Sequence, residues 1–179
     1  MIGLLSFHDS LSYGAILQCY ALQNTIQKSG ESCEFLNYKR RPSSTAKSGE
    51  SLKSRIKIFC LSIIAFIKRI VLKSEIEKKK KRFELFKKRY LNISEGEYTS
   101  FDELKDADLN YSAVVVGSDQ VWNPKTTGEN LKVYGLGFLD NGIRKIAYAP
   151  SIGLGTLNEA QKTQLKECVS DLDYYSCRE

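Results

Sequence analysis

A chain of 179 residues, 42% of them hydrophobic, is long enough to fill the core of one domain of common size. Five widely spaced cysteines with no C-x-x-C pair argue against a disulfide framework or a structural zinc site and favour a reducing cytoplasm. The net charge of +6 is uneven: residues 39–90 carry 18 Lys and Arg against 4 Asp and Glu, and the rest of the chain carries 9 against 17. This basic segment therefore predicts an anionic partner.

The first forty residues predict a β-loop-α-β unit. Residues 2–7 have the composition of a strand, residues 8–13 of a loop, and residues 33–38 of a second strand. Between them, residues 15–28 predict a helix that ends at Gly30, with Ile16, Leu17, Tyr20, Ala21 and Ile26 at helical spacing. Such a unit opens a Rossmann-like domain. It lacks G-x-G-x-x-G, so nothing here argues for NAD or FAD.

The basic segment resembles an insertion at about 39–91. Residues 39–52 have the composition of a linker, and residues 56–72 predict an apolar helix too short for the ~20 residues that span a bilayer. Two interpretations stay open: a helix on an anionic membrane surface through residues 53–90, or a helix packed on the domain with its lysine stems buried. Residues 75–91 predict a charged helix. No basic face interleaved with exposed aromatic residues occurs, so nucleic-acid binding is not expected.

The second half continues the alternation of strands and helices. Residues 112–116, 145–149 and 174–177 predict strands, residues 101–108 and 157–172 predict helices, and residues 128–142 predict an irregular stretch with a short strand or two. The fold class is therefore α/β, a Rossmann-like parallel sheet flanked by helices. Three strands end in small polar loops, which would share one edge if the strands are neighbours.

The loop after Val116 is the most informative of these. A β-branched run ends there in Gly117, Ser118, Asp119 and Gln120, which predicts either a ligand site or a strand cap beside a core Trp122. Exposed N–H groups and the hydroxyls of Ser118 and Ser151 suit phosphate or sugar hydroxyls. Asp119 is a candidate base or hydroxyl acceptor; the alternative is that these loops only cap helices. His8, the one histidine, is a candidate acid or base, or a structural residue.

Four segments together resemble the polysaccharide pyruvyl transferase family. They are Gly117-Ser-Asp-Gln-Val-Trp-Asn-Pro124, residues 13–23, residues 145–153, and Ser176-Cys-Arg-Glu179. The loop and motif residues are then candidate substrate-binding residues: Ser12, Tyr13, Gly14, Gln18, Gly117, Ser118, Gln120, Trp122, Ser151, Gly153 and Arg178. Asp119 and His8 are the catalytic candidates, and no metal is expected. The family usually has Asn where this chain has Ser12, which reaches less far.

The resemblance implies transfer of a pyruvyl group from phosphoenolpyruvate, the donor substrate, to two hydroxyls of a sugar, giving a ketal, with no cofactor. It also implies two Rossmann-like halves in the glycosyltransferase-B manner, of which residues 1–179 match the N-terminal one. We expect a cytoplasmic protein, peripheral to the membrane's inner face, acting on a sugar or lipid-linked oligosaccharide acceptor of a cell-surface polysaccharide. A C-terminal half or a second copy is the expected partner. Two alternatives remain: a non-catalytic fragment or subunit that needs a partner half, and a protein resembling sugar-nucleotide glycosyltransferases.

Overall fold

A computed structural model describes residues 1–40 and 57–178, with side chains described for residues 1–40 and 73–178. It divides into two compact units, residues 1–43 with 90–179 and residues 44–89. The first unit holds a sheet of six strands: β1 (Ile2–Leu5), β2 (Cys33–Tyr38), β3 (Ile93–Tyr98), β4 (Ala113–Gly117), β5 (Arg144–Tyr148) and β6 (Tyr174–Tyr175). Its order is β3-β2-β1-β4-β5-β6 and every pair is parallel, so the fold is α/β as expected.

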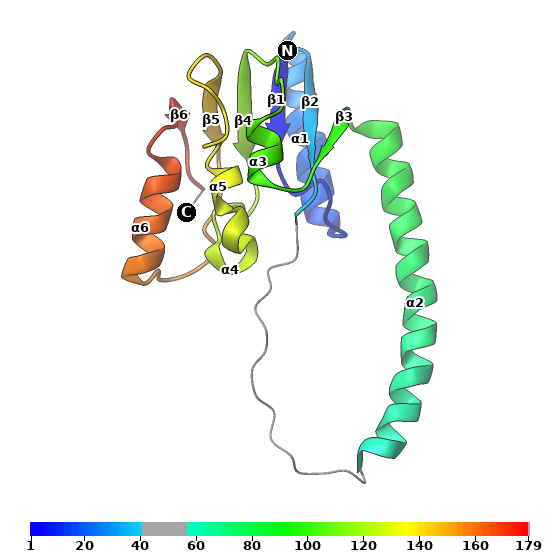
Figure 1. Ribbon diagram of the computed structural model, residues 1–179. Helices are drawn as coiled ribbons and strands as arrows, with labels where there is room; N and C mark the ends of the chain where they lie inside the picture. Colours follow the sequence, from blue (N-terminus) through cyan, green and yellow to red (C-terminus); the bar gives the residue numbers. More distant parts are fainter. Residues whose placement is uncertain (41–56, 179) are drawn as a thin grey trace. The chain divides into compact units, whose positions relative to one another are not determined.

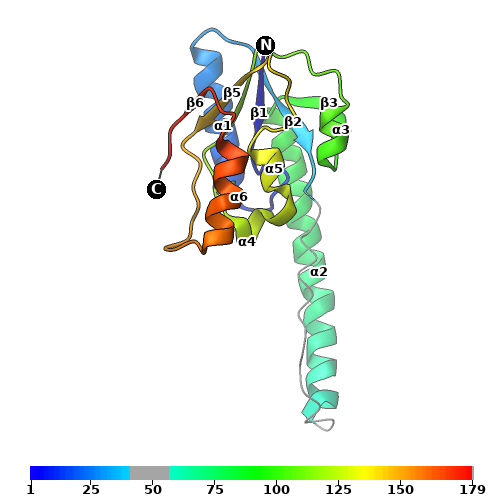
Figure 2. The same cartoon turned by 60° about the vertical axis from the view of Figure 1, so that its left-hand side comes forward.

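The helices of this unit cover both faces of the sheet. They are α1 (Tyr13–Lys28), α3 (Phe101–Lys105), α4 (Pro124–Thr127), α5 (Leu131–Tyr134) and α6 (Glu159–Val169), with a 3-10 turn at Gly128–Asn130. The sheet grows in one direction from β1 to β3 and in the other from β4 to β6. Right-handed crossovers therefore put α1 on one face and α3 to α6 on the other, as Figures 1 and 2 show.

The core is built from the alternating faces of the central strands. Leu5 pairs in register with Val116, and both side chains are buried on the face with α3 to α6 beside Leu36, Leu104 and Tyr134. Leu4 pairs with Val115 and faces α1, whose buried residues include Ile16, Cys19 and Leu22. Because parallel sheets are covered on both faces, nearly continuous apolar strands such as Ala113–Gly117 are the expected result.

The second unit is described by the helix α2 (Lys57–Tyr90), which the sequence predicts as two helices. No Gly or Pro separates residues 72 and 75, so nothing breaks the helix between the apolar and the charged parts. The side chains of residues 57–72, and the predicted linker at 41–52, lie outside the described residues. Among the helices that the structure describes, none combines the length and apolar content needed to cross a bilayer.

Several predictions of elements are wrong. The stretch at 128–142 contains short helical turns and no strand in the structure, because Leu131, Val133 and Tyr134 are buried by one helical turn. Strand β3 had no prediction; its sequence, Ile-Ser-Glu-Gly-Glu-Tyr, is only partly buried and is ordered by pairing with β2. The helix predicted at 15–28 is confirmed as α1, but two of its apolar residues at helical spacing, Leu17 and Ala21, are exposed.

Candidate functional site

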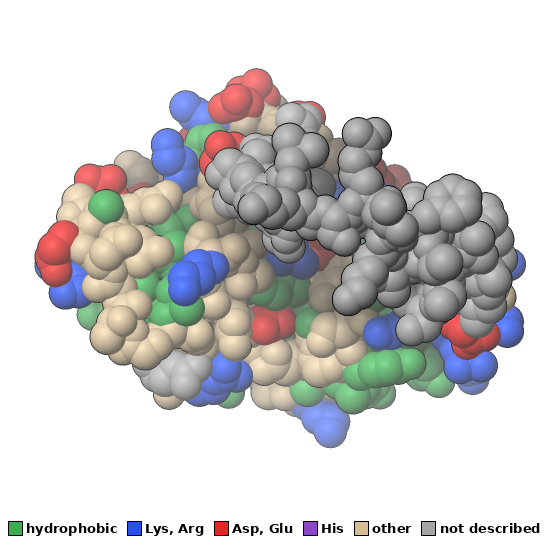
Figure 3. Space-filling view, turned by 90° about the horizontal axis from the view of Figure 1, so that it is seen from below, with side chains coloured by type: hydrophobic (Ala, Val, Ile, Leu, Met, Phe, Trp, Pro, Cys, Tyr) green, Lys and Arg blue, Asp and Glu red, His purple; other side chains and the backbone are tan. Residues whose placement is uncertain are grey.

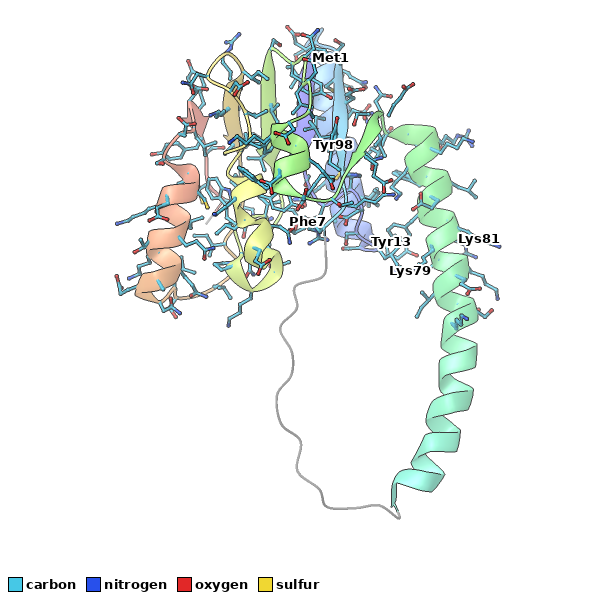
Figure 4. The ribbon with its side chains drawn as sticks, in the orientation of Figure 1. Met1, Phe7, Tyr13, Lys79, Lys81 and Tyr98 are labelled. Carbon is cyan, nitrogen blue, oxygen red and sulfur yellow. The ribbon has the colours of Figure 1, made fainter. Side chains whose placement is uncertain are left out.

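The three polar loops lie side by side at one edge of the sheet, as predicted. They follow β1, β4 and β5, which are consecutive neighbours in the parallel order. Strand order reverses between β1 and β4, and ligands of open α/β sheets bind at such a switch point, outside the carboxyl ends of the strands. Figure 4 labels Phe7 and Tyr13 at this edge and Met1 at the opposite end of the sheet. We call this edge, made by residues 8–14, 117–120 and 149–153, the carboxyl edge.

The loop after β4 is held in one conformation by backbone contacts. A Cβ on Gly117 would meet the carbonyl oxygen of Tyr148 at 2.3 Å, so only glycine allows β4 and β5 to approach this closely. Ser118 has a left-handed φ of 59° and donates its N–H to the same oxygen over 2.9 Å. The hydroxyl of Ser6, in β1's continuation, donates to Gly117 O at 2.9 Å. The turn that carries Ser118 and Asp119 is therefore fixed before any ligand arrives.

Asp119 and Gln120 tie the loop after β4 to the loop after β5. The carbonyl of Asp119 accepts from Ser151 N over 2.9 Å, and its carboxylate accepts from Gln120 N over 2.7 Å. A Cβ on Gly153, which has a φ of 60°, would meet the side chain of Gln120 at 2.5 Å. Predicted site residues of two motifs, Gln120 and Gly153, are thus in contact.

The start of α1 supplies the third part of the edge. Ser12 caps the helix, with its Oγ 3.5 Å from Ala15 N, and Tyr13 and Gly14 are exposed in the first turn. One turn later, Gln18 Nε2 donates to Ser118 Oγ over 3.5 Å, which joins α1 to the loop after β4. The capping bond uses the Ser12 hydroxyl itself, so at this position the side chain stabilises the helix end.

His8 and Trp122 lie inside the domain. His8 is 2% exposed, and its Nδ1 is 3.3 Å from the carbonyl oxygen of Ser6. Trp122 belongs to the core and donates its Nε1–H to Tyr134 O over 3.2 Å. Ser151 is fully buried, and its carbonyl accepts from Trp122 N over 3.3 Å. His8, Trp122 and Ser151 are therefore buried supports of the carboxyl edge, whereas Tyr13, Gly14 and Gln120 are exposed at its surface.

Arg178 is brought to the carboxyl edge by the last strand. Ser176 N donates to Ala147 O at 2.9 Å, and Arg178 N donates to Pro150 O at 3.2 Å, beside the loop after β5. Its side chain is exposed. The Ser-x-Arg motif and the Ser-x-Gly motif therefore meet, although 24 residues separate Gly153 from Arg178 in the sequence.

Two carboxylates act on one buried thiol between β1 and β4. Burial raises the pKa of Cys19 from 9.0 to about 12; a hydrogen bond with Ser6 lowers it, and the charges of Asp119 and Asp9 raise it. The thiol is therefore neutral at physiological pH and is no nucleophile. Asp9 and Asp119 come from different loops, so both loops lie within electrostatic range of this thiol.

A pocket of about 420 Å³ adjoins the edge on the face of the sheet that carries α1. Gln18, Ser118 and Tyr148 line it together with the apolar side chains of Leu22, Ile26 and Val115. Figure 3 looks onto the carboxyl edge, and acidic, basic and apolar side chains are interspersed on the surface that it draws in colour. Among the described residues, no three His, Cys, Asp or Glu side chains gather as metal ligands.

Sequence reasoning missed three residues near this edge. Asp9 in the loop after β1 and Arg40 after β2 form an ion pair, with Arg40 Nε 3.4 Å from Asp9 Oδ1. The charges of both act on the buried hydroxyl of Tyr134. Arg40 lies within residues 39–52, whose composition predicts a linker, so no local pattern marks it. A basic residue just after a predicted strand is the only signal that was available.

The family comparison agrees with this geometry. The family model described as polysaccharide pyruvyl transferase matches residues 13–179, which include every segment quoted for the resemblance. No curated protein and no solved structure matches the chain. The matched residues include strands β2 to β6, the start of α1 and the loops after β4 and β5, whereas β1 and residues 8–12 precede the match. The chain belongs to the polysaccharide pyruvyl transferase family.

Proposed function

We propose that this chain takes part in pyruvyl transfer from phosphoenolpyruvate to two hydroxyls of a sugar in a cell-surface polysaccharide precursor. The observation that carries the proposal is the meeting of the motif loops at the carboxyl edge of β1, β4 and β5. Exposed N–H groups of the first turn of α1, the hydroxyl of Ser118 and the carboxylate of Asp119 all belong to this edge.

The chemistry needs an acid, a base and donors for oxyanions. Protonation of the enol carbon gives an oxocarbenium-like centre, which one sugar hydroxyl attacks; phosphate then leaves, and a second hydroxyl closes the ketal. In this proposal Asp119 takes the proton from a sugar hydroxyl, because its carboxylate lies in a fixed loop at the switch point. His8 is the candidate proton donor. Because His8 is buried, the loop after β1, to which it belongs, has to move before substrate can reach its ring.

The test is transfer of pyruvyl to lipid-linked oligosaccharides from the native host, followed as phosphate release and as acid-labile pyruvate. Asp119→Asn should lower the rate at least 100-fold. Asp140→Asn is the matched control, because Asp140 is an exposed carboxylate in the turn before β5, at the other end of that strand. Equal rates for Asp119→Asn and the wild type would reject Asp119 as the base.

The same assay separates the alternatives. Inactivity of this chain alone, with activity restored by a separately made C-terminal half of a family member, would identify it as a subunit or part of a two-domain enzyme. Binding of a nucleotide sugar but not of phosphoenolpyruvate would favour the glycosyltransferase-like alternative.

A peripheral contact with anionic membrane through residues 53–90 belongs to the same proposal. In the described part of α2 most lysines and arginines are exposed, among them Lys80, Lys81 and Arg82. Lys79 and Lys81, labelled in Figure 4, both project from this helix. Two lysines are paired within the helix, Lys78 with Glu75 and Lys87 with Glu84. Exposed basic residues such as Lys80, Lys81 and Arg82 can meet lipid phosphates, each worth about 1 kcal/mol near an anionic surface.

Co-sedimentation with vesicles of phosphatidylglycerol tests this contact. Lys80→Gln with Lys81→Gln should reduce binding, and added salt should weaken it further. Lys105→Gln with Lys166→Gln, two exposed lysines of the sheet unit, is the control. No binding of the wild type would remove membrane contact from the proposal and leave the transfer reaction untouched.

A further inference from the structure

Arg40 is held in an unusual setting beside the carboxyl edge. Its guanidinium carbon lies 3.8 Å above the centroid of the Phe7 ring, and its Nε faces Asp9 Oδ1. The Arg40 side chain is 20% exposed. Arg40 follows β2, and Phe7 and Asp9 follow β1, so the neighbouring ends of two strands build the arrangement. We call Arg40, Asp9 and Tyr134 the Arg40 cluster.

Three buried polar atoms in this cluster have no hydrogen bond within the described parts of the chain. They are Asp9 Oδ1, Arg40 Nε and the hydroxyl oxygen of Tyr134. The ion pair at 3.4 Å satisfies the charges of Arg40 and Asp9 but not the directions of their hydrogen bonds. Tyr134 is 0% exposed, and the charges of Arg40 and Asp9 both act on it. Buried polar groups are seldom left unsatisfied, so three in one cluster indicate a polar molecule that completes it.

The guanidinium of Arg40 is oriented to donate hydrogen bonds to two oxygens of one ligand group. One face of the group is covered by Phe7, and the Nε side is directed at Asp9, which leaves its two Nη amino groups. Within residues 1–40 and 73–178 these amino groups have no hydrogen-bonding partner. A guanidinium fixed in this way is a rigid fork that matches a carboxylate or phosphate through parallel N–H···O bonds, which lysine cannot reproduce.

We propose that the Arg40 cluster binds a carboxylate or phosphate oxyanion of a substrate at the β1–β2 side of the carboxyl edge. Arg40 donates the two hydrogen bonds, the hydroxyl of Tyr134 donates a third, and Asp9 positions the guanidinium. The assignment of the oxyanion to a substrate rests on the proposed function; the binding itself does not. Phosphoenolpyruvate, the pyruvyl donor, carries both a carboxylate and a phosphate, whereas a phosphate-bearing acceptor carries only the phosphate.

Isothermal titration of the full chain with phosphoenolpyruvate, pyruvate and inorganic phosphate tests the site. We expect Arg40→Gln to weaken binding at least tenfold for the probes that bind the wild type. Arg144→Gln is the matched control, because Arg144 is exposed at the start of β5, at the opposite end of the strands. Binding by pyruvate as well as by phosphoenolpyruvate identifies a carboxylate site, whereas binding by phosphate but not by pyruvate identifies a phosphate site.

Two further variants keep the test decisive if Arg40→Gln unfolds. Arg40→Lys retains the charge and loses the fork, so it should stay folded and still bind more weakly; Tyr134→Phe removes only the hydroxyl and should weaken binding by a smaller factor. Unchanged affinity in folded Arg40→Lys or Arg40→Gln would overturn the proposal, as would a wild type that binds none of the three probes. Anion binding that depends on Arg40, in a protein that stays without transferase activity when a C-terminal half of a family member is added, would support the site and reject the proposed function.

Discussion

The sheet unit and the described side chains of α2, residues 73–90, are built on opposite plans. Around the sheet, buried side chains and close backbone approaches such as Gly117 against Tyr148 fix the loops of the carboxyl edge. Along residues 73–90 most side chains are exposed, and Phe83 is the one buried residue in this range. The sheet unit therefore fixes the geometry of the site, whereas the described part of α2 mainly presents positive charge. Substitutions in the sheet unit should alter folding and the site, and substitutions of the exposed residues of α2 should alter only its electrostatic attraction to other molecules.

The largest effect is expected at Gly117. Gly117→Ala puts a methyl group at 2.3 Å from a backbone oxygen, so β4 and β5 must separate, and we expect a loss of about 3 kcal/mol or more in the free energy of unfolding. Urea denaturation measures it. Gly142→Ala is the control, because nothing lies within 4 Å of the added methyl group. Equal urea midpoints for the two variants would contradict the close approach of the strands.

Replacing one leucine in each region by Ala compares the stabilising contacts of the two regions directly. Leu104 in α3 is fully buried, and its replacement by Ala should cost about 2–5 kcal/mol of unfolding free energy. Leu85 in α2 is 68% exposed, and the same replacement there should change stability by less than about 0.5 kcal/mol. Thermal and urea unfolding give both values. A large loss at Leu85 would show that this face of α2 is covered in solution.

Alkaline pH should destabilise the sheet unit through Cys19. Burial raises the pKa of this thiol to about 12, against 9.0 for an accessible thiol, so the unfolded chain loses the proton first. The stabilisation is complete below about pH 9 and is lost as the pH rises towards 12, at up to about 1.4 kcal/mol per pH unit. Cys19→Ala should flatten the dependence of stability on pH in this range. If the slope of stability against pH were the same in Cys19→Ala and the wild type, a group other than Cys19 would be responsible for it.

The smallest effect on stability is expected from charge reversal on α2. Lys80→Glu with Lys81→Glu changes two exposed residues and should leave the unfolding free energy within about 0.5 kcal/mol of the wild type. Circular dichroism during urea titration is the measurement. A marked loss of stability would mean that these lysines have an attractive role within the fold.

Much of the fold could be predicted because its signals are local. The strand at residues 33–38 agrees with β2, and the apolar run at Val114 to Val116 marks the central strand β4. The contact among the three loops followed from neighbouring parallel strands. Strand β3 could not be predicted, since its glutamates and glycine have low β-propensity and its order comes from pairing with β2.

The site was predictable in its loops and less so in its supporting residues. Ser118, Asp119, Gln120 and Gly153 occur in recognisable motifs, and the structure brings them together. The Arg40 cluster has no such pattern. Its members are residues 9, 40 and 134, and only the tertiary fold places Arg40, which belongs to the predicted linker, over the ring of Phe7. Periodicity and composition carry no information on such contacts.

The central claim is that substrate binds at the carboxyl edge between β1 and β4. Amide chemical shifts of the ¹⁵N-labelled protein, recorded during titration with phosphoenolpyruvate, test it most directly. The account predicts that the largest changes occur at Asp9, Gly14, Ser118, Asp119 and Gly153, with little change at Gly3 and Gly142 at the opposite end of the strands. Changes confined to α2 or to the opposite end, or no changes at saturating phosphoenolpyruvate, would contradict it.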